Sequence, residues 1–142
     1  MTECVTYRGA VYPWHCDHMG HMNVMWYVGK FDEATWNLMA RIGIAPKLLR
    51  NEPVGMAAVD QHLTYRRELL AGDVVDIASR ILEIGEKSIR FRHEMRNAES
   101  GELAATCEIT AVHLDRAARR SRPFSAAIQA AAKAFIAQQS AD

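Results

Sequence analysis

The sequence has no excess of charge of either sign and no long apolar run, and each shortage excludes a class of protein. Lys plus Arg and Asp plus Glu number 17 each among 142 residues, whereas a nucleic-acid-binding surface needs a clear basic excess. No run approaches the ~20 apolar residues that a membrane helix requires. The first residues, MTECVTYRGAVYP, lack the basic region and apolar stretch of a signal peptide. We therefore expect no nucleic-acid partner and no membrane insertion.

Cysteines are also few, because only Cys4, Cys16 and Cys107 are present and no CxxC pair occurs. Disulfide frameworks and thiolate metal sites both rely on paired cysteines, so this usage predicts a reduced, cytoplasmic protein. Hydrophobic residues make up 49% of the chain, which is enough for a packed core. The length predicts one domain over residues 1–142, and the near-neutral charge favours self-association.

Hydrophobic periodicity predicts one long helix between a short strand and four longer ones. Residues 23–42 carry apolar side chains at helical spacing, with Asn23 as N-cap and Gly43 as the stop. A strand at 4–12, broken near Gly9, precedes this helix. Four strand-like runs bounded by turn residues follow it, at 55–68, 73–84, 87–97 and 102–114. An Ala-rich segment near the end of the sequence predicts a second helix.

Short connections between the four runs predict antiparallel neighbours in chain order. Because a sheet must cover one face with something apolar, we expect an α+β fold. In it, a curved antiparallel five-stranded sheet wraps around one long central helix, and a C-terminal helix follows. On the central helix, Val24 and Val28 belong to the expected buried stripe, whereas Lys30 falls outside it. Alternation in the run 55–68 predicts a helix-facing side made of Val59, Gln61, Leu63 and Tyr65.

The stretch WHCDHMGHMNV, residues 14–24, gathers the side chains most suited to chemistry. His15, Cys16, His18 and His21 are possible metal ligands, but their spacing fits no common zinc pattern and no second cluster completes a set. We expect no metal. Cys16 as a nucleophile would need an activating base, and its sequence neighbours do not share its direction. A small buried side chain is the simpler interpretation of Cys16.

Asp17 offers a third interpretation, because its loop leads directly into the start of the long helix. Gly20 lies between Asp17 and the Asn23 cap and permits a tight turn. Unpaired N–H groups and the dipole at a helix start favour a developing negative charge. A carboxylate there can attack a carbonyl or activate water while N–H groups hold the oxyanion. Asp17 could instead only bond loop N–H groups, and the residues alone leave both interpretations open.

The segment WHCDHMGHMNVMWYVGKFDEA resembles the signature of hotdog-fold acyl-CoA thioesterases, specifically the 4-hydroxybenzoyl-CoA thioesterase-like group. The matching positions are Asp17, Gly20, His21, Asn23, Tyr27, Phe31, Glu33 and Ala34. The order of strands and helix also matches over nearly the whole chain. This loop differs in carrying His18 and His21 where other members often have residues that do not titrate. His21 could tune Asp17, whereas His18 is expected to be solvated.

The resemblance implies hydrolysis of an acyl-CoA thioester to a free acid and CoA, with Asp17 as nucleophile or general base. It implies that the backbone N–H of Val24 polarises the thioester carbonyl. It also implies a homo-dimer or tetramer with active sites between subunits, and no cofactor beyond the CoA of the substrate. The expected substrate-binding residues are Gly20, His21, Asn23, Tyr27, Gln61, Lys87 and Ser88. The acyl group is unspecified, and a thioesterase for acyl carrier protein or a non-catalytic acyl-CoA-binding module are the alternatives.

Overall fold

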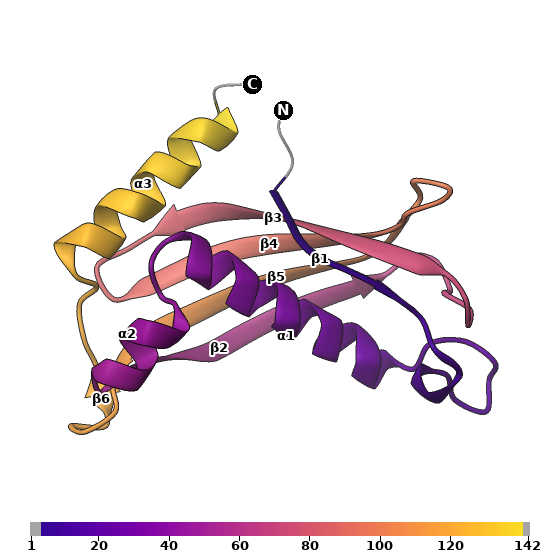
Figure 1. Ribbon diagram of the computed structural model, residues 1–142, viewed down its shortest axis with the longest axis horizontal. Coiled ribbons are helices and arrows are strands. Elements are labelled where there is room, and N and C mark those ends of the chain that lie inside the picture. The colour runs from indigo at the N-terminus through magenta and orange to yellow at the C-terminus, as the bar shows by residue number, and fades with distance from the viewer. Residues whose placement is uncertain (1–3, 141–142) are drawn as a thin grey trace.

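The computed structural model describes residues 4–140, in which one curved antiparallel sheet wraps around a long helix (Figure 1). The elements in chain order are β1 (Cys4–Ala10), the 3-10 helix η1 (Pro13–His15), α1 (Val24–Arg41), α2 (Pro46–Asn51), β2 (Val54–Tyr65), β3 (Val74–Ile84), β4 (Ser88–Asn97), β5 (Leu103–Asp115), β6 (Arg120–Ser121) and α3 (Ala126–Ser140). The expected α+β fold is confirmed, with the two-residue β6 as an addition. None of the described helices combines the length and apolarity needed to span a bilayer.

The order of strands differs from the prediction at one place. The sheet runs β1–β3–β4–β5–β2, so β2 pairs with β5 and is not a neighbour of β3. The connection between β2 and β3 crosses the start of α1, where the Arg67 carbonyl accepts from the Tyr27 hydroxyl at 3.2 Å. The Leu69 carbonyl accepts from the Met22 amide at 2.7 Å. The short connection can therefore run from β2, at one edge of the sheet, to β3, next to the other edge. Donors at the start of α1 supply its hydrogen bonds.

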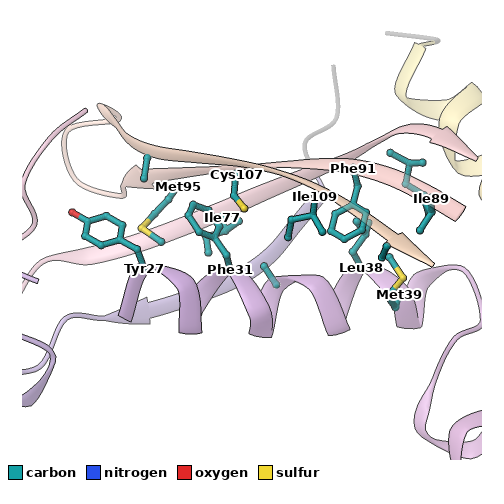
Figure 2. Close-up of a cluster of buried hydrophobic side chains, with 14 of the residues drawn as sticks. Tyr27, Phe31, Leu38, Met39, Ile77, Ile89, Phe91, Met95, Cys107 and Ile109 are labelled. Carbon is teal, nitrogen blue, oxygen red and sulfur yellow. The ribbon is translucent and has the colours of Figure 1, made fainter. Parts of the chain in front are cut away.

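Large apolar side chains from α1 and from the concave face of the sheet form the core (Figure 2). Phe31 and Leu38 project from α1 toward Ile77, Phe91 and Ile109 on the strands, and each is at most 4% exposed. Burial of one such side chain stabilises the fold by roughly 1.5–3 kcal/mol. This shared layer fixes α1 against the sheet and so fixes where the first turn of α1 lies.

The buried side of α1 is shifted from the predicted stripe. Val24 and Val28 are 57% and 39% exposed, and Val24 lies in the first turn of α1, beside a hollow. Lys30, which was placed outside the stripe, is only 3% exposed. Strand β1 packs over that flank, and the Lys30 ammonium donates to the Tyr7 hydroxyl at 2.7 Å. The prediction was wrong at these three positions.

His93 is a titratable group inside the core. It is 0% exposed, and its ring nitrogens hydrogen-bond to the hydroxyls of Ser79 and Thr35. The Phe31 ring stacks on the imidazole at 5.8 Å between centroids. Burial lowers the pKa of His93 to about 4. The side chain is therefore neutral at physiological pH and serves as a hydrogen-bonded part of the core.

Protonation of His93 should destabilise the fold in acid. The unfolded chain restores the ordinary histidine pKa near 6.5, so it binds more protons than the folded chain between about pH 6.5 and 4. We expect the free energy of unfolding to fall by up to roughly 3 kcal/mol as pH drops through this window. Urea unfolding of wild type and His93→Gln, at one protein concentration, measures the effect. An equal pH dependence in the two proteins would contradict it.

The two edges of the sheet differ in how far other parts of the chain cover them. At β1, side chains of α1 bond the strand, with the Asn37 amide donating to the Thr6 carbonyl at 2.5 Å and Lys30 donating to the Ala10 carbonyl at 3.4 Å. Beyond β1, α3 covers the free part of β3, where the Gln139 side chain both accepts from and donates to the Ile81 backbone. The opposite edge is β2 (Figure 1), and its residues 58–62 are all exposed.

Candidate active site

The loop before α1 folds back on itself. Cys16 and Met22 form an isolated antiparallel bridge, and a tight turn lies inside it, where the Gly20 N–H donates to the Asp17 carbonyl at 3.0 Å. Gly20 has φ +89°, a left-handed conformation that favours glycine. The tight turn expected at Gly20 is therefore present, and it holds Asp17 close to the start of α1.

The Asp17 carboxylate is held by two donors. Its Oδ1 accepts from the Met19 backbone N–H at 2.8 Å, and its Oδ2 accepts from the Asn23 side-chain amide at 2.8 Å. The bond from Asn23, then that from Met19, lowers the pKa of Asp17 below its ordinary value, and His21 and His18 add smaller electrostatic contributions. The carboxylate is therefore ionised at neutral pH and fixed in orientation.

Asn23 connects this carboxylate to the helix start. While its amide group holds Asp17, its Oδ1 caps α1 by accepting from the Met25 backbone N–H at 2.9 Å. The Val24 backbone N–H has no hydrogen-bond acceptor among residues 4–140. An ionised carboxylate and a free N–H on the first helical turn thus lie on either side of one cap residue. This is the pair that can attack and polarise a carbonyl group.

The two functions of Asn23 can be separated by substitution. Asn23→Ser keeps a good cap but loses the bond to Asp17. We therefore expect near-wild-type stability and, for the thioester hydrolysis that the sequence resemblance implies, about tenfold slower turnover, the value of one charge-assisted hydrogen bond. Asn23→Ala loses both bonds and should also lose about 1 kcal/mol of stability. Thermal unfolding and steady-state kinetics of the pair measure this. Equal turnover in Asn23→Ser and wild type would show that the bond does not position Asp17.

A hollow of about 250 Å³ opens beside this helix start. It is lined by His21, Met22, Val24, Tyr27, Tyr65, Arg66, Arg67 and Glu68. The rings of Tyr27 and Tyr65 meet edge to face at 5.1 Å, and burial raises the pKa of Tyr27 to about 12, so its phenol stays neutral. The Glu68 carboxylate lies 3.7 Å from His21 Nε2. Because it adjoins the candidate catalytic loop, we call it the active-site hollow, a name that marks it as the candidate site.

The structure gathers six of the predicted site residues at this end of the sheet. His21, Val24 and Tyr27 line the active-site hollow, whereas Asp17, Gly20 and Asn23 lie in the adjoining loop and outside the wall itself. Met22 and Glu68 are wall residues that sequence reasoning missed. Tyr65 carried a usable signal, because alternation had already placed it on the helix-facing side of its strand.

The other three predicted binding residues lie elsewhere in the chain. Gln61 is exposed in the middle of β2, about 13 Å along the strand from Tyr65 at ~3.3 Å per residue. Lys87 and Ser88 lie at the turn between β3 and β4, where Ile84 pairs with Ile89. That turn is at the other end of the sheet from the Asp17 loop (Figure 1). A role for these residues in CoA binding stays a prediction.

The residues considered as metal ligands do not converge. No group of three or more His, Cys, Asp or Glu side chains suited to a metal ion occurs in the described part of the chain. His15 is 9% exposed, with its Nδ1 accepting from the Tyr12 backbone N–H at 3.0 Å. His18 is exposed, and His21 faces Glu68. The Cys16 thiol approaches the Tyr12 carbonyl at 3.9 Å.

Comparison with known proteins finds similar sequences and structures, some of them named thioesterases. The sequence model of the thioesterase-like superfamily matches residues 11–132 of this chain. A betainyl-CoA thioesterase from Pseudomonas aeruginosa is 27% identical over 130 residues, which are 92% of this chain and 82% of that protein. A candidate thioesterase structure from Pseudomonas putida has a TM-score of 0.86 at 27% identity, covering 99% of this chain and 90% of the other. A hypothetical protein from Staphylococcus aureus, solved in complex with CoA, has a TM-score of 0.89 at 22% identity, covering 96% and 87%.

Proposed function

Because the chain belongs to the thioesterase-like superfamily, we propose that it hydrolyses an acyl-CoA thioester at the active-site hollow, with Asp17 and the Val24 N–H acting on the carbonyl. Thioester hydrolysis rests on the family. The placement of the reaction rests on one observation, the ionised Asp17 carboxylate held by Asn23 beside a free N–H on the first turn of α1. His21 and Tyr27 shape the acyl end of the hollow, and Gly20 sets the turn that presents Asp17.

In the proposed reaction, the thioester carbonyl oxygen accepts from the Val24 N–H and gains negative charge there. An Asp17 oxygen attacks the carbonyl carbon, the C–S bond breaks, and CoA leaves as a thiolate that takes a proton from water. Water then hydrolyses the mixed anhydride and restores Asp17. In the alternative route, Asp17 takes a proton from the attacking water. A lowered pKa gives little driving force for that transfer at neutral pH, which supports the anhydride. Rapid-quench mass spectrometry would detect acylated Asp17.

We propose a short acyl group with a cationic head as the preferred substrate. The hollow measures about 250 Å³, and its wall offers the Tyr27 and Tyr65 rings together with the Glu68 carboxylate. Arg66 and Arg67 also line it, and the Arg67 charge is paired with Glu102 at 2.7 Å. Aromatic faces and a carboxylate recognise quaternary ammonium groups, and the Pseudomonas aeruginosa relative is named for betainyl-CoA. A panel of betainyl-, isovaleryl-, benzoyl- and palmitoyl-CoA, with free thiol as the readout, tests this. Equal rates for betainyl- and isovaleryl-CoA would contradict it.

The same assay distinguishes the enzyme from its alternatives. Tight acyl-CoA binding without turnover would favour a non-catalytic module, and faster turnover of acyl carrier protein thioesters would make that carrier the substrate.

Turnover should survive prolonged treatment with a chelator, because the loop residues do not form a metal site. Cys16→Ala should keep most activity, since among residues 4–140 the thiol contacts the Tyr12 carbonyl and no base. Activity that one added metal ion restores would contradict the proposal.

The proposed enzyme is a homo-oligomer that assembles through the β2 edge. Residues 58–62 of β2 are exposed in the single chain, and an uncovered edge strand is a template for pairing with another chain. Large apolar side chains are exposed on two elements, namely Val59 on β2 (61%) and Met25 and Val28 on α1 (62% and 39%). A second copy would cover them. A dimer formed in this way would place partner residues near the active-site hollow, which adjoins the end of β2.

A further inference from the structure

A second hollow, of about 540 Å³, lies between α1 and β1, and we call it the β1–α1 cleft. It shares no wall residue with the active-site hollow, which adjoins the end of β2 instead. The wall of the cleft is rich in aromatic rings and carries one ammonium and one carboxylate. It is lined by Tyr7, Gly9, Ala10, Tyr12, Trp14, His15, Trp26, Gly29, Lys30 and Glu33.

The ammonium of Lys30 is buried without an anion. Lys30 is 3% exposed, and its Nζ donates to the Tyr7 hydroxyl at 2.7 Å and the Ala10 carbonyl at 3.4 Å. Its Nζ also lies 5.0 Å from the centre of the Tyr7 ring. No ion pair of residues 4–140 includes Lys30. Neutral oxygens compensate a buried charge only in part, and an anionic ligand would complete the set.

The Lys30 environment is built by the backbone of β1. The Tyr7 ring folds back over Gly9, where a Cβ atom would overlap the Tyr7 hydroxyl. Any side chain at position 9 would displace the phenol that bonds Lys30. The Lys30 ammonium therefore keeps its hydroxyl partner in the wall of the cleft because Gly9 leaves room for the Tyr7 ring. Glu33 lines the same cleft but is exposed to water, which screens its charge.

The walls of the β1–α1 cleft offer flat rings and a further N–H donor. Trp14 is 65% exposed and stacks on Tyr12 at 4.4 Å and 3°, so one large ring is presented to solvent. The His15 ring lies 4.6 Å from that of Trp26. Because His15 Nδ1 accepts from the Tyr12 N–H at 3.0 Å, the proton of the neutral imidazole is on Nε2, which is a donor. Burial and the nearby Lys30 charge hold the pKa of His15 below its ordinary value.

We propose that the β1–α1 cleft binds a small aromatic carboxylate, with its ring against Trp14 and Trp26 and its carboxylate paired with the Lys30 ammonium. A cationic ligand would meet the Lys30 charge in surroundings that screen it poorly. An aliphatic carboxylate would leave the indole faces without a stacking partner. The site is separate from the active-site hollow, so its occupation does not depend on thioester hydrolysis.

Benzoate is the probe for this site, with benzamide as its neutral analogue of similar shape. Isothermal titration calorimetry on the full chain should give a dissociation constant of about 1 mM for benzoate, as expected for a small ligand. Benzamide should bind at least ~10-fold more weakly, because it lacks the charge that pairs with Lys30. Equal binding of the two compounds, or no benzoate binding at ~20 mM, would overturn the proposal.

Two variants and one control locate the binding. Lys30→Met keeps an apolar stem of similar length and should weaken benzoate binding at least ~10-fold, whereas thioester turnover should stay within about threefold of wild type. Trp14→Ala should weaken benzoate binding about fivefold through lost stacking. Because Trp14 is exposed, this substitution should leave the fold intact. Arg66→Met removes a cation from the active-site hollow and should leave benzoate binding unchanged. Weakened binding in Arg66→Met, with Lys30→Met unaffected, would move benzoate to the active-site hollow and overturn the proposal.

Discussion

Asp17→Asn should lower kcat by at least ~10²-fold while KM changes much less. An amide is a far weaker nucleophile and base than a carboxylate, and the lost interaction belongs mainly to the transition state. If Asp17 only ordered the loop, the rate should stay within about threefold, the value of one neutral hydrogen bond. Steady-state kinetics with the preferred acyl-CoA measure the difference. A near-wild-type kcat would end the proposed mechanism and turn attention to His21 or Glu33.

The structure supplies a matched control for this substitution. An asparagine at position 17 can still accept from the Met19 N–H, but its amide nitrogen cannot accept from Asn23, as Oδ2 does at 2.8 Å. Asn23→Ser loses that same bond and keeps the carboxylate. The kcat ratio between the two variants therefore isolates the chemistry of the carboxylate from the order of the loop. Both proteins must show native secondary structure and native oligomeric state.

Val59→Lys should convert the proposed oligomer into monomers and reduce thioester turnover at least ~10-fold. A lysine on an edge strand opposes pairing with another strand, and Val59 is 61% exposed in the exposed segment of β2. Because the change is at the surface of the single chain, its fold should persist. Sedimentation equilibrium and kinetics at one protein concentration measure both effects.

The other edge strand provides the control for Val59→Lys. Val5 on β1 is 46% exposed, so Val5→Lys adds the same charge to the opposite edge of the sheet. Mass and turnover should be unchanged in Val5→Lys. If Val59→Lys keeps the wild-type mass, β2 is not the interface. If it becomes an active monomer, the active-site hollow needs no partner.

Local signals predicted much of the fold and the start of the site. Asn23 was expected to cap the long helix, and it does so through Met25. A tight turn was expected at Gly20 because glycine permits one, and the residue has φ +89°. Such features are decided within a few residues of chain, so the sequence alone can specify them.

Long-range packing limited the rest of the prediction. The position of β2 beside β5 depends on bonds between the connection and α1, such as that of Tyr27 to Arg67, which no local pattern reveals. Burial of Lys30 required β1 to lie along α1. The expected alternation in β2 was also disturbed, because the register shifts between Ala58 and Asp60, and Val59 is exposed. Helix α2 was missed, although Pro46 at its first turn was a usable signal.

The difference between the two edges of the sheet limits how many further chains could add strands to it. Asn37 and Lys30 occupy carbonyls of β1, and Gln139 occupies the backbone of β3, so incoming strands meet side chains already bonded there. In the described part of the chain, β2 is the long edge strand opposite β1, and its residues 58–62 are exposed. Two copies joined at β2 would consume both of their open edges. Strand addition then stops at two chains, and runaway stacking into fibres of the cross-β kind has no template from which to start.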